Sequence, residues 1–182
     1  MQLEVSDLMT NHRRALDGFS AIVAQGAGRW GNCSPCAEWD AGAVVEHVIE
    51  IHDRFLLGPT GTEPVRPEDD PAGRWTATAS AIGPAVEVAS SADLDAVDLD
   101  GALPALMGEL VIHTWDLAKA IGVDPDLDPD LCAISYGSMR SHEEQVRSSG
   151  LFAAAVPIDD SADPASRLIA FVGRDPDWTR EA

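Results

Sequence analysis

A glutamate and a histidine four residues apart, Glu109 and His113, have the types and spacing of metal ligands. Positions four apart lie one above the other on the same face of an α-helix, so both side chains can reach one ion. The neighbours of His113 at helical spacing are apolar, which predicts that this side of the helix faces the core. The alternatives are a weak surface pair or a buried histidine that only forms hydrogen bonds.

A second histidine, His47, lies in an earlier stretch whose apolar stripe includes Val44, Val48 and Ile51. If the two helices face each other, His47, Glu109 and His113 form a set of two histidines and one carboxylate. Such a set leaves coordination positions open for water or a substrate. Zinc suits these ligands, and ferrous iron is an alternative. Taken alone, His47 has the competing interpretation of a core residue.

Other polar residues near this set have different predicted roles. Asp116 follows His113 by three residues, where it can orient a ligand or contact a substrate, the alternative being an exposed acid. His12 lies on an inward stripe and is a reserve ligand. His52 is about 140° around the helix from His47, which predicts a structural or exposed residue. His142 lies in a polar stretch and is predicted to be solvated.

Two of the three cysteines, Cys33 and Cys36, have the spacing of half a zinc knuckle. The third, Cys132, stands alone, so neither a second pair nor a disulfide framework is present. We interpret the pair as structural loop thiols, with a redox or substrate-proximal role as the alternative. Free thiols favour a reducing environment, so we expect a cytoplasmic protein.

The composition limits the class of partner. The 182 residues carry a formal net charge of −19, and only one of the twelve basic residues is a lysine, Lys119. Such a chain is repelled by nucleic acids and by anionic membranes, so we expect neither as a partner. We expect a small-molecule substrate, and a homodimer is also open. The N-terminus lacks the pattern of a signal peptide, and no stretch approaches the ~20 apolar residues of a membrane span.

The periodicity predicts an all-α fold in one domain over residues 1–182. Asp40 and the pairs Asp128-Pro129 and Asp163-Pro164 are typical helix starts, and Gly122 is a typical helix end. The predicted helices cover residues 3–25, 41–57, 72–90 with a kink or break at Gly83-Pro84, 102–121 and 129–148, followed by a short helix that ends near Gly173.

Several segments together resemble the actinobacterial DinB-like proteins, which are related to the N-terminal domain of mycothiol-dependent maleylpyruvate isomerase. They are Ser34-Pro-Cys-Ala-Glu-Trp-Asp40, Val45-Glu-His-Val48, Glu109-Leu-Val-Ile-His-Thr-Trp-Asp116 and the closing stretch from Asp163 to Pro176. The resemblance implies a four-helix bundle, here with extra C-terminal helical segments. It also implies a divalent metal, most often zinc with Ni²⁺ or Fe²⁺ as alternatives, held by His47, Glu109 and His113.

Characterised members of that group activate a low-molecular-weight thiol, mycothiol or bacillithiol. The isomerases have a further C-terminal domain that helps to build their active site. Many short members of the group have no established activity, so the resemblance does not specify a substrate. We therefore expect a metal-dependent enzyme in which a thiol or water attacks a small electrophile, by thiol transfer, isomerisation or hydrolysis. The alternative is a non-catalytic bundle that binds a metal or small molecule and acts as an interaction or regulatory protein.

Overall fold

A computed structural model describes residues 5–37, 39–91, 97–150 and 152–180. The described residues contain no β-strand, only an isolated antiparallel bridge between Cys33 and Asp40. The chain is therefore all-helical, as the sequence predicts. In chain order the elements are α1 (Val5–Val23), α2 (Ala41–His52), the π-helical segment η1 (Asp53–Leu57), α3 (Pro71–Ser91), α4 (Leu99–Ile121), α5 (Pro129–Ser141), α6 (Glu143–Ser148) and α7 (Pro164–Phe171).

Four predicted helix-end residues are confirmed. The side chains of Asp40, Asp128 and Asp163 each accept hydrogen bonds from backbone N–H groups in the first turn of α2, α5 and α7. These bonds satisfy donors that have no partner within the helix. Gly122 ends α4 in the left-handed conformation, with φ 73°. Because residues with a Cβ rarely adopt this conformation, the glycine fixes where α4 stops.

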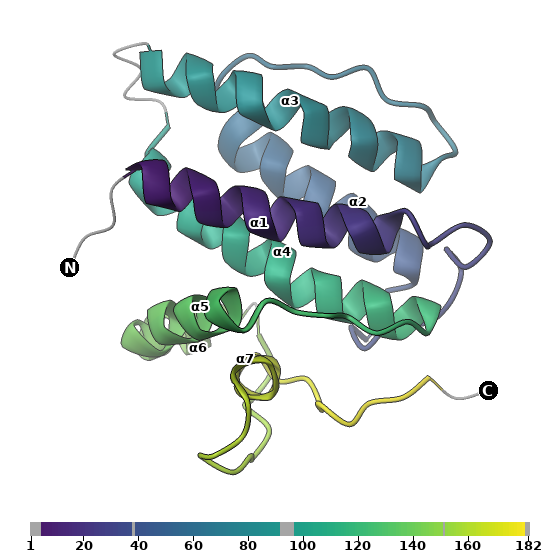
Figure 1. Ribbon diagram of the computed structural model, residues 1–182, viewed down its shortest axis with the longest axis vertical. Coiled ribbons are helices and arrows are strands. Elements are labelled where there is room, and N and C mark those ends of the chain that lie inside the picture. The colour runs from purple at the N-terminus through teal and green to yellow at the C-terminus, as the bar shows by residue number, and fades with distance from the viewer. Residues whose placement is uncertain (1–4, 38, 92–96, 151, 181–182) are drawn as a thin grey trace.

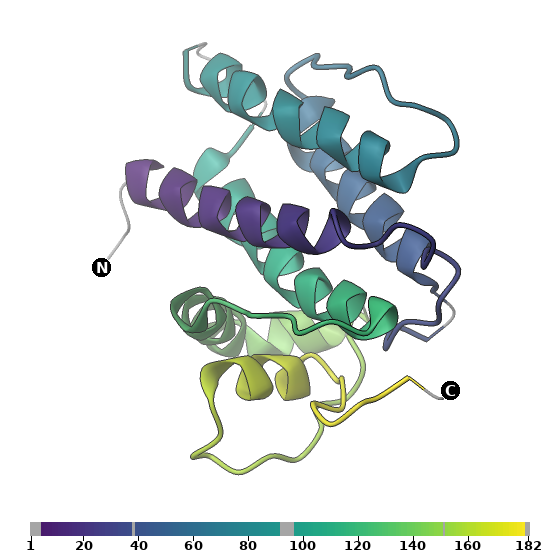
Figure 2. The same ribbon diagram turned by 45° about the vertical axis from the view of Figure 1, so that its right-hand side comes forward.

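Helices α1 to α4 pack together, and α4 is the central one (Figures 1 and 2). On one side α4 packs against α1 and α2, and α3 covers these two helices. On the other side lie α5 and α7, which also pack against each other. All residues from 110 to 118 are consequently buried. The side chains that α4 carries are thus held in a rigid, solvent-poor setting.

An aromatic pair fixes α3 onto α1. The rings of Phe19 and Trp75 lie 4.7 Å apart in an edge-to-face arrangement, and both residues are almost fully buried. The indole N–H of Trp75 donates a hydrogen bond of 2.9 Å to the hydroxyl of Ser20. This bond satisfies the one polar atom of the indole, so the whole side chain can be buried at low cost.

No helix in the described ranges combines the length and hydrophobicity needed to cross a bilayer.

Two features of the predicted helices differ from the structure. Of the kink or break predicted at Gly83-Pro84, the break is absent, since α3 continues through Pro84. Pro84 and Ser80 are both exposed, so the carbonyl that loses its helical donor faces water. The predicted helix 129–148 is instead interrupted at His142, whose backbone has φ −120° and ψ 30°. Neither glycine nor proline occurs among the four residues directly before this break, so the sequence offered no sign of it.

The remaining helices differ from prediction at their ends. Of the predicted helix 3–25, residues 3 and 4 lie outside the described residues, and the helix ends at Val23. The predicted helix 41–57 changes to π-helical geometry at Asp53, where the N–H of Gly58 donates to the carbonyl of Asp53 at 2.8 Å. The helix predicted over 102–121 begins three residues earlier, where Asp98 caps it.

Candidate metal centre

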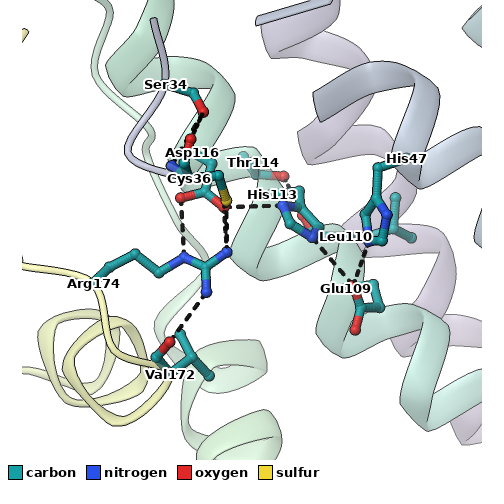
Figure 3. A network of polar contacts seen from close by, with 10 residues as sticks. All are labelled: Ser34, Cys36, His47, Glu109, Leu110, His113, Thr114, Asp116, Val172 and Arg174. Atoms are coloured by element: carbon teal, nitrogen blue, oxygen red, sulfur yellow. Dashed lines mark hydrogen bonds and ion pairs between the residues drawn. The ribbon is translucent and has the colours of Figure 1, made fainter. Parts of the chain in front are cut away.

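The structure brings His47, Glu109 and His113 together. His47 comes from α2, and the other two come from successive turns of α4 (Figure 3). Oε2 of Glu109 lies 3.3 Å from Nε2 of His47 and 3.2 Å from Nε2 of His113. All three potential ligand atoms lie within 4.8 Å of one another. The helical spacing aligns the α4 pair, and packing of α2 against α4 adds the third side chain.

These separations fit a divalent cation. Nitrogen and oxygen ligands of tetrahedral zinc are about 3.3 Å apart, given their usual bond lengths. The protonation pattern fits as well. Nδ1 of His113 lies 2.9 Å from Oδ2 of Asp116, so the ring donates its Nδ1 proton to that carboxylate. In a neutral ring Nε2 then carries only a lone pair, yet it faces the Glu109 carboxylate. Only a positive charge between these two atoms, a proton or a metal ion, makes that contact favourable.

The ligand set has one side open to solvent. The side chains of His47 and Glu109 are 27% and 25% exposed, whereas that of His113 is 5% exposed. The indole of Trp39 packs against both imidazoles, with ring centroids 4.6 Å from His47 and 5.9 Å from His113. Three protein ligands with an accessible side are typical of catalytic zinc sites, and structural sites instead have four protein ligands.

Behind His113 lies a second group of polar side chains, centred on Asp116 (Figure 3). Asp116 is fully buried, and its carboxylate accepts hydrogen bonds from three side chains. His113 Nδ1 donates to Oδ2, and the Cys36 thiol donates to the same oxygen at 3.2 Å. Arg174 donates through Nε to Oδ1 at 3.2 Å and through Nη2 to Oδ2 at 3.0 Å. This is the arrangement by which proteins orient a metal-binding imidazole.

The charges of these groups are interdependent. Burial by itself would lower the pKa of His113, but hydrogen bonds to Asp116, Cys36 and Glu109 raise it well above the usual value. Burial would raise the pKa of Glu109, but hydrogen bonds from His113 and His47 lower it. Burial would likewise raise the pKa of Asp116, and His113 and Arg174 together lower it. Both carboxylates are therefore ionised at neutral pH and favour a cation in the site.

The other candidate residues lie elsewhere. His12 is buried and lies outside the ligand set. Its Nε2 instead faces Nε2 of His52, 3.4 Å away. His52 is also buried, and its Nδ1 donates to the carbonyl of Val48 at 2.6 Å, as suits a structural residue. His142 is exposed. Of the three cysteines, Cys36 contacts the polar group around Asp116. Cys33 is exposed and Cys132 is buried.

Sequence reasoning assigned no role to two residues of this region, Trp39 and Arg174. Trp39 lies directly before the N-cap of α2, so the loop that starts the helix also brings the indole onto His47. Arg174 is 58 residues from Asp116 in sequence, and no local pattern links them. One signal was available: a buried aspartate needs a cation, and the chain has only twelve lysines and arginines.

These features define an all-helical protein with a cluster of histidines and carboxylates between two helices. Two proteins of Mycobacterium tuberculosis are similar to it, uncharacterized protein Rv0738 of strain ATCC 25618 / H37Rv and uncharacterized protein MT0763 of strain CDC 1551 / Oshkosh. Each is 31% identical over 180 residues, which span 92% of this chain and 98% of the relative. The chain therefore belongs to the same family as these two proteins. No protein-family model matches the chain, and no solved structure matches it significantly.

Proposed function

We propose that this protein is a DinB-like helical bundle that holds one divalent metal ion through His47, Glu109 and His113. The observation that carries the proposal is the convergence of three potential ligand atoms within 4.8 Å of one another. The packing of α1 to α4 around these residues, and the resemblance of their motifs to DinB-like proteins, support the same assignment. Zinc is the first choice of metal for two imidazoles and a carboxylate, with Ni²⁺ and Fe²⁺ as alternatives.

The proposed activity is metal-dependent attack of a thiol such as mycothiol, or of water, on a small electrophile. A bound divalent cation supplies Lewis acidity, which favours the deprotonated nucleophile at neutral pH. The exposed sides of His47 and Glu109 leave access for a small molecule. Asp116 fixes the ring of His113, and Trp39 excludes water from one side of the ligand set. Thiol transfer is the first candidate reaction, followed by thiol-assisted isomerisation and hydrolysis.

A screen of the zinc-loaded protein tests this activity. The protein is incubated with a panel of small electrophiles, with and without mycothiol, and substrate loss is followed by mass spectrometry. We expect turnover that depends on zinc and is lost in Glu109→Gln, and that depends on the thiol as well unless the reaction is hydrolysis. His142→Gln is the matched control, because this exposed histidine lies outside the ligand set. Equal turnover by wild type and Glu109→Gln would contradict the proposal.

A non-catalytic binding protein is the second candidate, and the position of two surface grooves favours it. One groove, of about 290 Å³, is lined by Trp115, Asp124 and Ser166 among others. The other, of about 340 Å³, lies between α1 and α3 beside Trp75. Neither is lined by His47, Glu109 or His113. Wild-type protein that retains stoichiometric zinc but converts no electrophile, with or without mycothiol, would support this candidate.

A further inference from the structure

The C-terminal segment sends one side chain, Arg174, to the rear of the candidate metal centre. Its guanidinium donates to both oxygens of Asp116, from Nε at 3.2 Å and from Nη2 at 3.0 Å (Figure 3). Nη2 also donates to Sγ of Cys36 at 2.8 Å, and Nη1 donates to the carbonyl of Val172 at 3.1 Å. The side chains of Arg174 and Asp116 are 12% and 0% exposed, so the ion pair between them is largely shielded from water.

Local sequence determines where Arg174 lies. Gly173 adopts φ 83° directly after α7, its N–H donates to the carbonyl of Ala170, and the N–H of Arg174 donates to the carbonyl of Ile169. These two bonds form a Schellman motif, the helix ending that requires a left-handed residue, usually glycine. The motif reverses the chain at the end of α7 and directs Arg174 toward α4. The position of this side chain is therefore encoded by the helix ending.

The pairing has a definite physical consequence for His113. A buried carboxylate without a cation is costly, and a planar guanidinium that binds both of its oxygens also fixes the plane of the carboxylate. The same carboxylate accepts the Nδ1 proton of His113, so its orientation determines that of the ring. The ring orientation in turn determines whether Nε2 points at Glu109, 3.2 Å away.

We propose that Arg174 is a positioning residue of the metal centre, which acts through Asp116 to hold the His113 ring in its ligating orientation. The C-terminal segment after α7 is then a required part of the site, although it contributes no ligand. This inference rests on the proposed metal site. It adds that the affinity and geometry of the site depend on a residue outside the α2–α4 pair.

The test compares Co²⁺ binding by wild type, Arg174→Met and a matched control, Arg147→Met. Arg147 holds the end of α7, donating to the carbonyls of Phe171 at 2.7 Å and Ala153 at 2.9 Å, and none of its hydrogen bonds involves Asp116. Visible absorption of Co²⁺ reports both affinity and ligand geometry. We expect Arg174→Met to weaken binding by about 10- to 100-fold, as is typical of residues that support ligands, and to change the Co²⁺ spectrum. Arg147→Met should lower thermal stability but leave Co²⁺ affinity and spectrum unchanged.

Arg174→Lys keeps the test decisive if Arg174→Met folds poorly, and a double variant tests the coupling to Asp116. Arg174→Lys keeps the charge but loses the planar fork, and we expect a smaller loss of affinity with an altered spectrum. In an Asp116→Asn background, Arg174→Met should weaken Co²⁺ binding much less than it does in wild type, since the two residues act as one unit. Equal Co²⁺ affinity in Arg174→Met, Arg147→Met and wild type would overturn this inference alone. Wild-type protein that binds no Co²⁺ would overturn the proposed metal site as well.

Discussion

Nδ1 of His113 lies 2.9 Å from the buried carboxylate of Asp116, one turn further along α4. This contact assigns the Nδ1 proton of His113 and leaves Nε2 pointing at Glu109. An unbroken series of contacts follows, from Arg174 through Asp116, His113 and Glu109 to His47. A histidine that only fills space in the core has no need of a carboxylate on each side. The series needs a positive charge between His113 and Glu109, either a proton or the proposed metal ion.

The indole of Trp39 makes the candidate site observable by fluorescence. Its ring centroid is 4.6 Å from that of His47 and 5.9 Å from that of His113, so an ion held by these residues lies close to the indole. We expect Cu²⁺ to quench tryptophan emission until one ion per chain has bound. The variant Trp39→Phe should lose most of the emission that Cu²⁺ quenches, while Trp30→Phe should retain it. Identical quenching in both variants would contradict the placement of Trp39.

The buried pair His12 and His52 predicts how stability depends on pH. Burial, and the charge of the partner histidine, lower the pKa of His12 to about 3. Burial also lowers the pKa of His52 to about 4, although its bond to the Val48 carbonyl opposes this. In the unfolded chain both groups titrate near 6.5. Below that pH these two positions bind more protons in the unfolded chain than in the folded one, so their contribution to the free energy of unfolding falls as pH decreases.

Between pH 7 and pH 5 each of these histidines should remove about 1–2 kcal/mol from the free energy of unfolding. Urea denaturation at the two pH values measures the loss. In His12→Gln the difference between pH 7 and pH 5 should shrink by roughly the contribution of one histidine. The exposed residue His142 supplies the control, since His142→Gln should leave the difference unchanged. An unchanged pH dependence in His12→Gln would show that the pair does not remain neutral when folded.

Two glycines with positive φ provide a matched pair for testing the packing after α7. Gly122 has φ 73°, and a Cβ added there would meet no atom within 4 Å. Gly173 has φ 83°, and an added Cβ would lie 2.7 Å from Cβ of Ala153. Gly122→Ala should therefore cost only the strain of the left-handed conformation, about 1–2 kcal/mol. Gly173→Ala should cost clearly more, because Ala153 must also move; equal losses of unfolding free energy in the two variants would refute this close approach.

Much of the helical frame follows from local sequence. Asp40, Asp128 and Asp163 start helices because their side chains accept bonds from nearby backbone N–H groups, which needs no tertiary contact. The alignment of Glu109 with His113 also follows from spacing alone. The unbroken course of α3 through Pro84 could not be predicted this way. It depends on which face of the helix is exposed, and packing determines that face.

The candidate site divides along the same line. Its α4 half was predictable, whereas the approach of His47 depends on α2 packing against α4. The resemblance to DinB-like proteins implied all three candidate ligands, His47, Glu109 and His113, as one set. Helical periodicity alone left a purely structural role open for each of them. The contact between Arg174 and Asp116 had no sequence signal, since it joins positions 58 residues apart through a helix ending. Long-range pairing of this kind is set by tertiary structure.

Metal content is the most direct test of the central claim. Purified wild-type protein and His113→Ala are stripped with a chelator, reloaded with Zn²⁺, desalted and analysed by plasma mass spectrometry, with His142→Ala as the control. We expect one zinc ion per chain in wild type and in His142→Ala. Loss of a residue that supports a ligand weakens metal binding by about 10- to 100-fold. His113→Ala removes a proposed ligand itself, so its affinity for zinc should fall by more than this. Wild-type protein that takes up no zinc, or His113→Ala that retains as much as wild type, would contradict the account.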